Sequence, residues 1–414
     1  MLKYRPIDKL KDEFINILAG GHGIVEINRL VRTDAGLQRA FGRKACGEQS
    51  TISRTLSACS DKNVEEMTEA LKVIYRKQSQ GYRHDYEKSI QVLDIDITGL
   101  VAGRQAEGAT KGYFSGKRNR RGRQLGRVLA TNYGEIVRDK LYQGTVQLDQ
   151  NLQELVKEAE GVLDLDESRR KRTLIRIEGG GGKDEDINWL LERGYWVMGK
   201  VKQWRRARKL ANTVTTWYPD SKEPGREYGW VNTPHEYTRA TRQIAIRSEI
   251  GGKTVHRVLV FNLTDEMLSD LAQATASSTT TEKATIEAAL YVYDQRGGGV
   301  ETSNKGSKQG LGLNKRIKRS FAAQEILTLL AQLAFNLIVW VRSLLAKHNP
   351  ALAQFGTLRM VRDLFHIQGS FRLDHTGKIF SVCLNSTHDL ALSVWQTWHA
   401  SFALDGLSLI LRKI

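Results

Sequence analysis

The N-terminal part of the chain carries apolar residues at helical spacing. Met67, Leu71 and Ile74 lie three or four residues apart and would share one face of a helix over Val64–Lys77. This pattern predicts a helical N-terminal domain over residues 1–85. Helices of this kind either pack together or present Ser and Arg side chains to DNA, and both interpretations stay open.

At Ile90 the pattern changes to one that is typical of β-strands. Ile90–Thr98 alternates apolar residues with two aspartates, Asp94 and Asp96, which lie two residues apart and hence on one face of a strand. A carboxylate in so apolar a strand is costly unless a cation or hydrogen-bond donors meet it. The alternative is an edge strand whose acidic face is exposed to water.

A second acid follows a later strand. Leu148–Leu163 is an amphipathic helix, and the chain then enters a short β-branched run that ends at Glu178. A helix over Asp184–Arg193 and a strand over Tyr195–Val201 come next. Residues 86–201 therefore predict an open α/β sheet, in which functional groups lie at the carboxyl ends of the strands.

Four glycines follow Glu178 and suggest a loop that binds phosphate. A Walker motif would need glycine where Ile177 stands and Ser or Thr where Asp184 stands. The glycines therefore do not form that motif, and the acid is the feature of this segment that points to chemistry.

Residues 202–282 form a segment of different composition, rich in Trp, Thr, Val, Tyr and Arg. They predict a β-rich insertion with short strands. The strands are expected at Asn212–Trp217, Thr238–Ile246 and Val255–Phe261. Trp217 lies among arginines, a combination that stacks on unpaired bases, and its alternative role is in the core of this small domain.

The chain returns to helix after a linker rich in Ser, Thr and Ala. Residues 283–347 carry a helix over Ala284–Arg296, then three glycines, Glu301, and Lys308 seven residues further on. Seven residues are two helical turns, so Glu301 and Lys308 would share one face of a helix. Residues 348–414 predict a C-terminal unit of strand and helix without a catalytic pattern.

The net charge of the chain indicates what kind of partner it binds. Lys and Arg number 63 against 46 Asp and Glu, a net charge of +17, which favours a polyanion such as nucleic acid over an ordinary basic enzyme. A basic run over Lys117–Gln124 would suit a hairpin tip beside a phosphate backbone, although many charge runs are simply solvated. The candidates for DNA contact in this run are Arg118, Arg120, Arg121 and Arg123.

Several other classes are excluded by composition. Three cysteines are too few and too scattered for a disulfide framework or a zinc site, and the nine histidines form no pair at metal-ligand spacing. The N-terminus does not resemble a signal peptide. The strongest predicted helix, Ser320–Lys347, is interrupted by Gln332, Asn336 and Arg342, so a membrane span is not expected. These features indicate a soluble, intracellular protein.

Three acids, Asp96, Glu178 and Glu301, remain as candidates for one site. Their placement on a first strand, at the end of a later strand and on a helix after an insertion is that of an RNase H-like polynucleotidyl transferase. From about Ile90 to Leu345 the chain resembles the DDE transposases of bacterial insertion sequences. Asp96 matches the first acid of that family.

The third acid carries the most specific part of the resemblance. In the cut-and-paste branch of the family it lies in a Tyr-Arg-Glu-Lys signature, which Tyr293, Arg296, Glu301 and Lys308 match with one additional residue between Arg and Glu. For the first acid, Asp94 is the weaker candidate.

The resemblance implies a fold and a chemistry. The fold is α/β, an RNase H-like catalytic core interrupted by the β-rich insertion and preceded by the helical domain. The three acids would hold Mg²⁺, with Mn²⁺ as a substitute, for phosphodiester hydrolysis and strand transfer. Arg296 and Lys308 would hold phosphates, and Tyr293 and Trp217 would also contact DNA.

The partners that the resemblance implies are double-stranded DNA, as transposon terminal inverted repeats and target DNA, and a second copy of the chain. No membrane is involved, and the expected location is the bacterial cytoplasm at the nucleoid.

Glu178 departs from the family pattern, because the second acid is normally Asp. Its additional methylene displaces the carboxylate by about 1 Å, and a displacement of that size can cost on the order of 10²-fold in rate. Two alternatives therefore accompany the transposase interpretation. One is a transposase-derived DNA-binding protein without activity, and the other is a structure-specific nuclease on the same fold.

Overall fold

The computed structural model describes residues 4–43, 45–112, 114, 119–272, 281–401 and 407–413. The chain divides into two compact units. We call them the helical unit (Met1–Gln78, Leu100–Thr110 and Asn304–Ile414) and the sheet unit (Ser79–Gly99 and Lys111–Ser303). The three candidate acids all lie in the sheet unit.

The sheet unit is built on a mixed sheet whose central strand is the predicted acidic strand. Its core strands are β1 (Gln91–Val101), β3 (Arg121–Ala130), β4 (Glu135–Gln143), β5 (Thr173–Ile177) and β6 (Trp196–Lys200). They lie in the order β4–β3–β1–β5–β6, with β5 parallel to both β1 and β6, and β3 antiparallel to β4. This is the strand order of an RNase H-like core, so the predicted fold class is confirmed.

The segment between the second and third acids adds strands to this same sheet. They are β7 (Tyr218–Pro219), β8 (Arg226–Trp230), β9 (Arg242–Ile250) and β10 (Lys253–Phe261). β10 pairs antiparallel with β6, and β9, β8 and β7 follow in order. The insertion is β-rich, and it continues the sheet of the core instead of forming a sheet of its own. The two-residue strand β2 (Thr110–Lys111) lies at the other end, next to β3.

One predicted strand of the insertion is wrong. No strand forms over Asn212–Trp217, which follows a helix, α8 (Trp204–Ala211), that the β-rich composition concealed. Its apolar residues Ala207, Leu210 and Ala211 stand at helical spacing and are buried against β9 and β10. The packing of this short, arginine-rich helix on the sheet therefore outweighs the local β-propensity of the segment.

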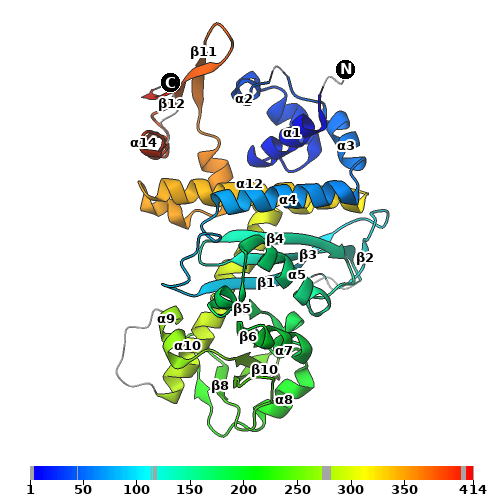
Figure 1. Cartoon of the computed structure of the whole chain (residues 1–414), viewed down its shortest axis with the longest axis vertical. Coiled ribbons are helices and arrows are strands. Elements are labelled where there is room, and N and C mark those ends of the chain that lie inside the picture. The colour runs from blue at the N-terminus through cyan, green and yellow to red at the C-terminus, as the bar shows by residue number, and fades with distance from the viewer. Residues whose placement is uncertain are drawn as a thin grey trace. The chain divides into compact units, whose positions relative to one another are not determined.

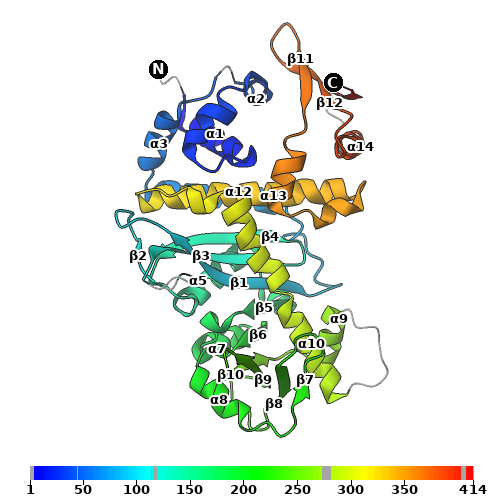
Figure 2. The same cartoon turned by 180° about the vertical axis from the view of Figure 1, so that it is seen from behind.

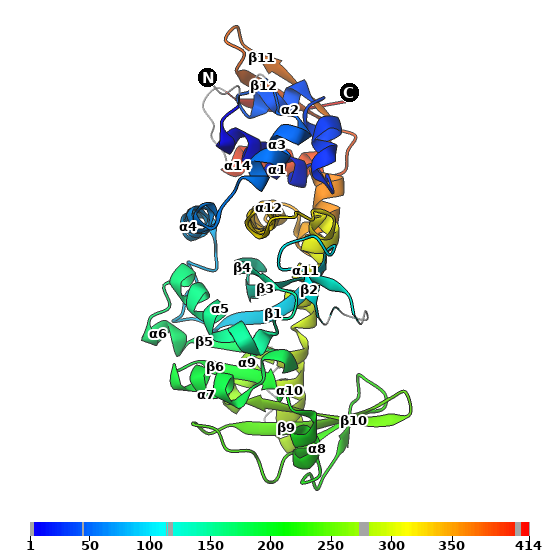
Figure 3. The same cartoon turned by 90° about the vertical axis from the view of Figure 1, so that its right-hand side faces the viewer.

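Helices cover both faces of the core sheet. On one face lie α5 (Leu148–Leu163), α6 (Glu167–Arg170) and α7 (Asp184–Glu192), and on the other lies α10 (Glu282–Asp294) (Figure 3). Seen from behind, α10 passes in front of the strands (Figure 2). A short helix, α9 (Asp265–Ala272), packs against α10.

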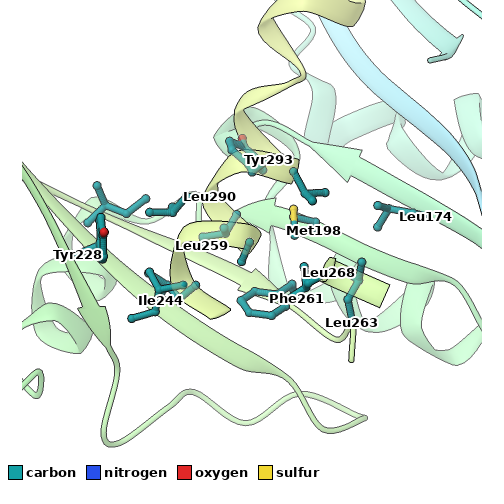
Figure 4. Close-up of a cluster of buried hydrophobic side chains, with 14 of the residues drawn as sticks. Leu174, Met198, Tyr228, Ile244, Leu259, Phe261, Leu263, Leu268, Leu290 and Tyr293 are labelled. Carbon is teal, nitrogen blue, oxygen red and sulfur yellow. The ribbon is translucent and has the colours of Figure 1, made fainter. Parts of the chain in front are cut away.

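The core between α10 and the sheet is continuous across the catalytic strands and the insertion. Leu174 of β5, Met198 of β6 and Phe261 of β10 meet Leu290 and Tyr293 of α10 in one buried cluster (Figure 4). Burying large apolar side chains of this kind is the main favourable term in folding. The helix that leads to the third acid is therefore held firmly on the sheet that carries the first two.

The helical unit contains the N-terminal helices, the long helix α12 and a C-terminal sheet (Figure 1). The long helix α12 (Phe321–Ala346) packs along α4 (Asp61–Gln78). The other helices are α1 (Pro6–Leu18), α2 (Ala35–Ala40), α3 (Gln49–Ser57), α13 (Thr357–Arg359) and α14 (Ala391–Ser401). The C-terminal sheet has β11 (Gly369–Leu373), β12 (Ile379–Asn385) and β13 (Ser408–Arg412).

The helix α12 is long and apolar enough to cross a membrane, with a mean hydropathy of 1.7 over its most apolar window. It is also 56% buried inside the protein over that window, as the core helix of a soluble protein would be. Gln324, Gln332 and Asn336 are among its buried residues. Buried polar side chains are costly in a membrane span, so a core role explains the helix better.

Candidate active site

The register of three parallel strands brings the first two acids together. Ile95 of β1 pairs with Ile177 of β5, which pairs with Gly199 of β6. The residue after each of these is therefore Asp96, Glu178 or Lys200. The three lie in one row across the sheet, at the carboxyl ends of β5 and β6 and midway along the longer β1. We call these three residues the carboxyl-end row.

The carboxyl-end row faces α10. Two residues earlier on the same strands, Asp94, Arg176 and Met198 pair with one another. Arg176 donates to the backbone carbonyl of Val292 in α10, and Met198 packs in the α10 cluster. Because side chains in strands alternate with a period of two, the row lies on this same face.

Two signature residues hydrogen-bond to the backbone of the acidic strands just before the acids. Tyr293 donates its hydroxyl to the Ile177 carbonyl at 3.2 Å, and Arg296 donates Nη2 to the Ile95 carbonyl at 3.0 Å. These carbonyls belong to the residues just before Glu178 and Asp96. Tyr293 and Arg296 are each only 3% exposed, so the geometry favours positioning of the acids over the direct DNA contact expected for them.

The negative charges of Glu178 and Glu301 act on Asp96. Burial raises the pKa of Asp96 to about 6, the neighbouring Arg296 opposes this, and the charges of Glu178 and Glu301 add to it. The Asp96 side chain is 13% exposed and lies 3.9 Å from Nη2 of Arg296. Glu178 and Glu301 are exposed. Each of these two acids therefore lies close enough to Asp96 to repel its negative charge.

Asp94 has a different environment. It is fully buried, accepts bonds at 2.7 and 2.8 Å from Nε and Nη2 of Arg176, and accepts a third at 2.7 Å from the Thr131 hydroxyl. A carboxylate whose two oxygens already accept three hydrogen bonds is poorly suited to bind a metal ion as well. This favours Asp96 as the first acid.

The third acid ends a π-helical turn. The segment Gly297–Glu301 is π-helical and continues into α11 (Thr302–Lys305). A π turn contains one more residue than an α turn, and such turns are frequent at functional sites. The additional residue between Arg296 and Glu301 is accommodated in this turn.

Close packing places the π turn on the sheet. A Cβ at Gly299 would lie 2.8 Å from Oδ2 of Asp94 and 3.1 Å from Cγ2 of Thr131, so only glycine permits the approach. On the other side of Glu301, the Ser303 hydroxyl accepts from Arg127 at 3.2 Å and donates to the Val300 carbonyl at 2.7 Å. Glu301 is held between these two contacts.

The remaining predicted DNA contacts differ in exposure. Arg120 is exposed and Arg121 half-buried, whereas Arg123 is only 1% exposed because β3 is buried along nearly its whole length. Arg123 is therefore removed from the expected basic surface. Arg118 lies outside the described residues. Lys308 is half-buried in a second π turn, Gly306–Gly310, of the helical unit.

Trp217 is half-buried in the small core beneath α8. The Arg247 guanidinium lies 4.2 Å from the centre of its ring, within cation–π distance. This arrangement agrees with the core role that was left open for Trp217.

Lys200 is the member of the carboxyl-end row that sequence reasoning missed. It is half-buried, and its Nζ lies 4.7 Å from the centre of the Tyr293 ring. Burial lowers its pKa, and the charge of Glu178 opposes that shift. Only the pairing of β5 with β6 places Lys200 beside Glu178, and this pairing cannot be predicted from the local sequence pattern.

The chemistry of the three acids, Asp96, Glu178 and Glu301, suits a divalent metal ion. Carboxylate oxygens are the ligands that Mg²⁺ prefers, and mutual repulsion among three of them is relieved by a cation. In the described part of the chain, no group of three or more His, Cys, Asp or Glu side chains is already arranged to hold a metal. Glu178 and Glu301 are exposed, so their side chains are free to reorient toward Asp96.

The chain matches the family described as Transposase DDE domain group 1 over residues 1–371, and it belongs to that family of DDE transposases. Among solved structures it is similar to the piggyBac transposase in its synaptic complex with hairpin DNA, determined by cryo-electron microscopy. That likeness has a TM-score of 0.48 and 11% identity, and covers 88% of this chain and 72% of that chain. No curated protein matches the chain.

Proposed function

We propose that this DDE transposase is the product of a bacterial insertion sequence and moves that element by cut-and-paste transposition. The reaction is Mg²⁺-dependent hydrolysis at the element's terminal inverted repeats, followed by transfer of the 3′ end to target DNA. The observation that carries the proposal is the placement of Asp96 and Glu178 side by side on neighbouring parallel strands, next to backbone carbonyls to which Tyr293 and Arg296 donate.

In this mechanism Asp96, Glu178 and Glu301 would hold the divalent ions, with Mn²⁺ as a substitute for Mg²⁺. When bound, such ions polarise the phosphodiester and activate the attacking oxygen. Arg296 keeps Asp96 oriented through its contacts with that carboxylate and with the backbone before it. Tyr293 does the same for the strand end that carries Glu178.

Basic and aromatic side chains of the sheet unit support DNA as the partner. Trp204 of α8 is 65% exposed, and Arg205, Arg208 and Lys209 of the same helix are exposed. Arg120 offers a further exposed cation. Such residues neutralise backbone phosphates and stack on bases, so DNA affinity is expected to fall steeply with salt. The active form is proposed to be a homodimer on two terminal repeats in the bacterial cytoplasm.

The test is cleavage of a labelled duplex that carries the element's own terminal repeat, with Mg²⁺ or Mn²⁺. Glu178→Ala should abolish cleavage and leave DNA binding nearly intact, because binding rests on basic residues elsewhere. Glu178→Asp should raise the Mg²⁺-dependent rate by about one to two orders of magnitude, since it restores the shorter acid. Glu185→Ala is the matched control, because Glu185 is exposed at the start of α7 and lies outside the row.

Full activity in Glu178→Ala would show that Glu178 is not the second acid. Joined products distinguish a transposase from a nuclease on the same fold. The second candidate function, a DNA-binding protein without activity, is favoured by Glu178 itself, since the family normally has Asp there. It would be supported if Glu178→Asp bound the terminal repeat and still failed to cleave it with either metal.

A further inference from the structure

We propose that Lys200 is a further catalytic residue, whose ammonium group contacts the phosphate that reacts at the carboxyl-end row. This inference rests on the proposed function. It assigns to β6, the strand after the second acid, a part in the chemistry beyond the three carboxylates and the signature residues.

The strand register places Lys200 beside Glu178. Ile177 pairs with Gly199, so Glu178 and Lys200 follow as neighbours on parallel strands and point to the face of α10. A Cβ at Gly199 would lie 2.6 Å from Cγ1 of Ile177, so glycine lets the strands approach closely. The Nζ of Lys200 then lies over the Tyr293 ring at 4.7 Å.

The glycine run after Glu178 holds the backbone of Lys200 in place. A Cβ at Gly182 would lie 1.9 Å from the Lys200 carbonyl oxygen, so no other residue fits there without a shift of backbone. The Gly182 carbonyl accepts a bond from the amide of Lys202 at 3.2 Å. These glycines, which do not form a Walker motif, serve to pack the loop against the strand end that presents Lys200.

Lys200 differs from the neighbouring lysines in its partners. Lys183 and Lys202 both form ion pairs with Asp149, at 3.0 and 2.5 Å. Within the described residues, no carboxylate lies within 4.0 Å of the Lys200 ammonium. A half-buried cation without an anionic partner is costly, and its cost is recovered when an anion binds. A phosphate at the row would supply that anion.

In hydrolysis, the oxygen of a water molecule forms a bond to phosphorus and the water gives up a proton to solvent. The bond from phosphorus to the 3′ oxygen breaks, and that oxygen takes up a proton from solvent. Negative charge grows on the phosphate oxygens as this occurs. The Lys200 ammonium donates to one of these oxygens and keeps its own proton throughout. Donors that are placed in advance where charge develops are a large source of rate acceleration.

The experiment compares full-length wild type, Lys200→Met, Lys200→Arg and a control, Lys157→Met, at saturating terminal-repeat DNA. Lys157 is exposed on α5, on the face of the sheet opposite α10, so its substitution removes the same charge away from the row. Lys200→Met should slow cleavage by about 10²- to 10³-fold. Lys200→Arg should recover part of that loss, and Lys157→Met should cleave as wild type does. Lys200→Met should melt no lower than wild type, because it removes a half-buried charge, so its slower cleavage would not come from unfolding.

A second measurement does not depend on activity. Mn²⁺ binding to the DNA-free protein should tighten about threefold to tenfold in Lys200→Met, because a cation beside the three acids has been removed. Wild-type cleavage together with an unimpaired Lys200→Met would overturn the inference. If the wild type cleaves with neither metal, the proposed function fails. The Mn²⁺ affinity then tests Lys200 independently, and an affinity that is unchanged in Lys200→Met would show that Lys200 does not lie at the metal site.

Discussion

Arg176 donates two hydrogen bonds to Asp94, from Nε to one carboxylate oxygen at 2.7 Å and from Nη2 to the other at 2.8 Å. Asp96 lies two residues further along the same strand face, 3.9 Å from Nη2 of Arg296, and its side chain is 13% exposed. Two aspartates that look alike in the sequence thus have different environments. Asp94 joins strands β1 and β5 through a buried ion pair, whereas Asp96 is the candidate for the first acid.

This difference predicts opposite responses to substitution. Asp94→Ala should lower the free energy of unfolding by about 3–5 kcal/mol, because it leaves the Arg176 charge buried without its partner. Asp96→Asn should abolish cleavage while the protein remains at least as stable as wild type. Urea unfolding and the cleavage assay measure the two effects. An active Asp96→Asn protein, or an Asp94→Ala protein of undiminished stability, would show that the assignments are reversed.

The raised pKa of Asp96 predicts a dependence on pH. Its folded-state pKa of about 6 exceeds the ordinary 3.8, so the folded protein holds this proton more tightly than the unfolded chain does. The charged form therefore costs stability, and the cost grows as pH rises from about 4 to 6 and is constant above that. Asp96→Asn should accordingly gain stability over wild type across this range.

Thermal unfolding of both metal-free proteins between about pH 4 and 8 measures this difference. Mn²⁺ binding by the wild type should weaken as pH falls through about 6, because protons compete for the Asp96 carboxylate. Stability curves that run parallel for the two proteins across the whole range would contradict the prediction.

The local elements follow from local patterns, which explains how much of the fold could be predicted. Leu148–Leu163 is a helix over the predicted residues because its buried leucines and valines repeat at helical spacing. The two acidic strands were also predicted, since both are apolar, β-branched runs, the first with two aspartates inside it and the second ending at Glu178. Helix α8 was missed because it has few apolar positions, and its packing on β9 and β10 outweighed local propensity.

The site could be predicted only in part, because register and burial are properties of distant pairings. The acids could be named from their types and order, whereas Lys200 enters the site only once Ile177 is paired with Gly199. Tyr293 and Arg296 were identified by their signature, but their hydrogen bonds to backbone carbonyls depend on the docking of α10. Sequence spacing does not contain these contacts.

Gly299 provides a test of how the third acid is positioned. A methyl group at Gly299 would meet the Asp94 carboxylate at 2.8 Å, so Gly299→Ala should cost about 1–3 kcal/mol of stability and displace Glu301, lowering cleavage. Gly298 has open space around it, so Gly298→Ala is the matched control and should gain up to about 1 kcal/mol from its better helix propensity. Unfolding and cleavage assays compare them. Equal behaviour of the two variants would refute close packing at Gly299.

The π turn before Glu301 should tolerate the deletion of one residue. Its hydrogen bonds join residues five apart, where an α turn joins residues four apart, so the turn absorbs one additional residue without moving its ends around the helix. Deleting Gly297, whose missing side chain has no neighbour within 4 Å, should convert the segment into an α turn and leave Glu301 on the same side of the helix. Cleavage should stay within about tenfold of wild type.

Deleting both Gly297 and Gly298 should rotate Glu301 by about 100° and abolish cleavage, while α10 and DNA binding persist. A single deletion as inactive as the double deletion would mean that the π turn itself, and not merely the direction of Glu301, is required.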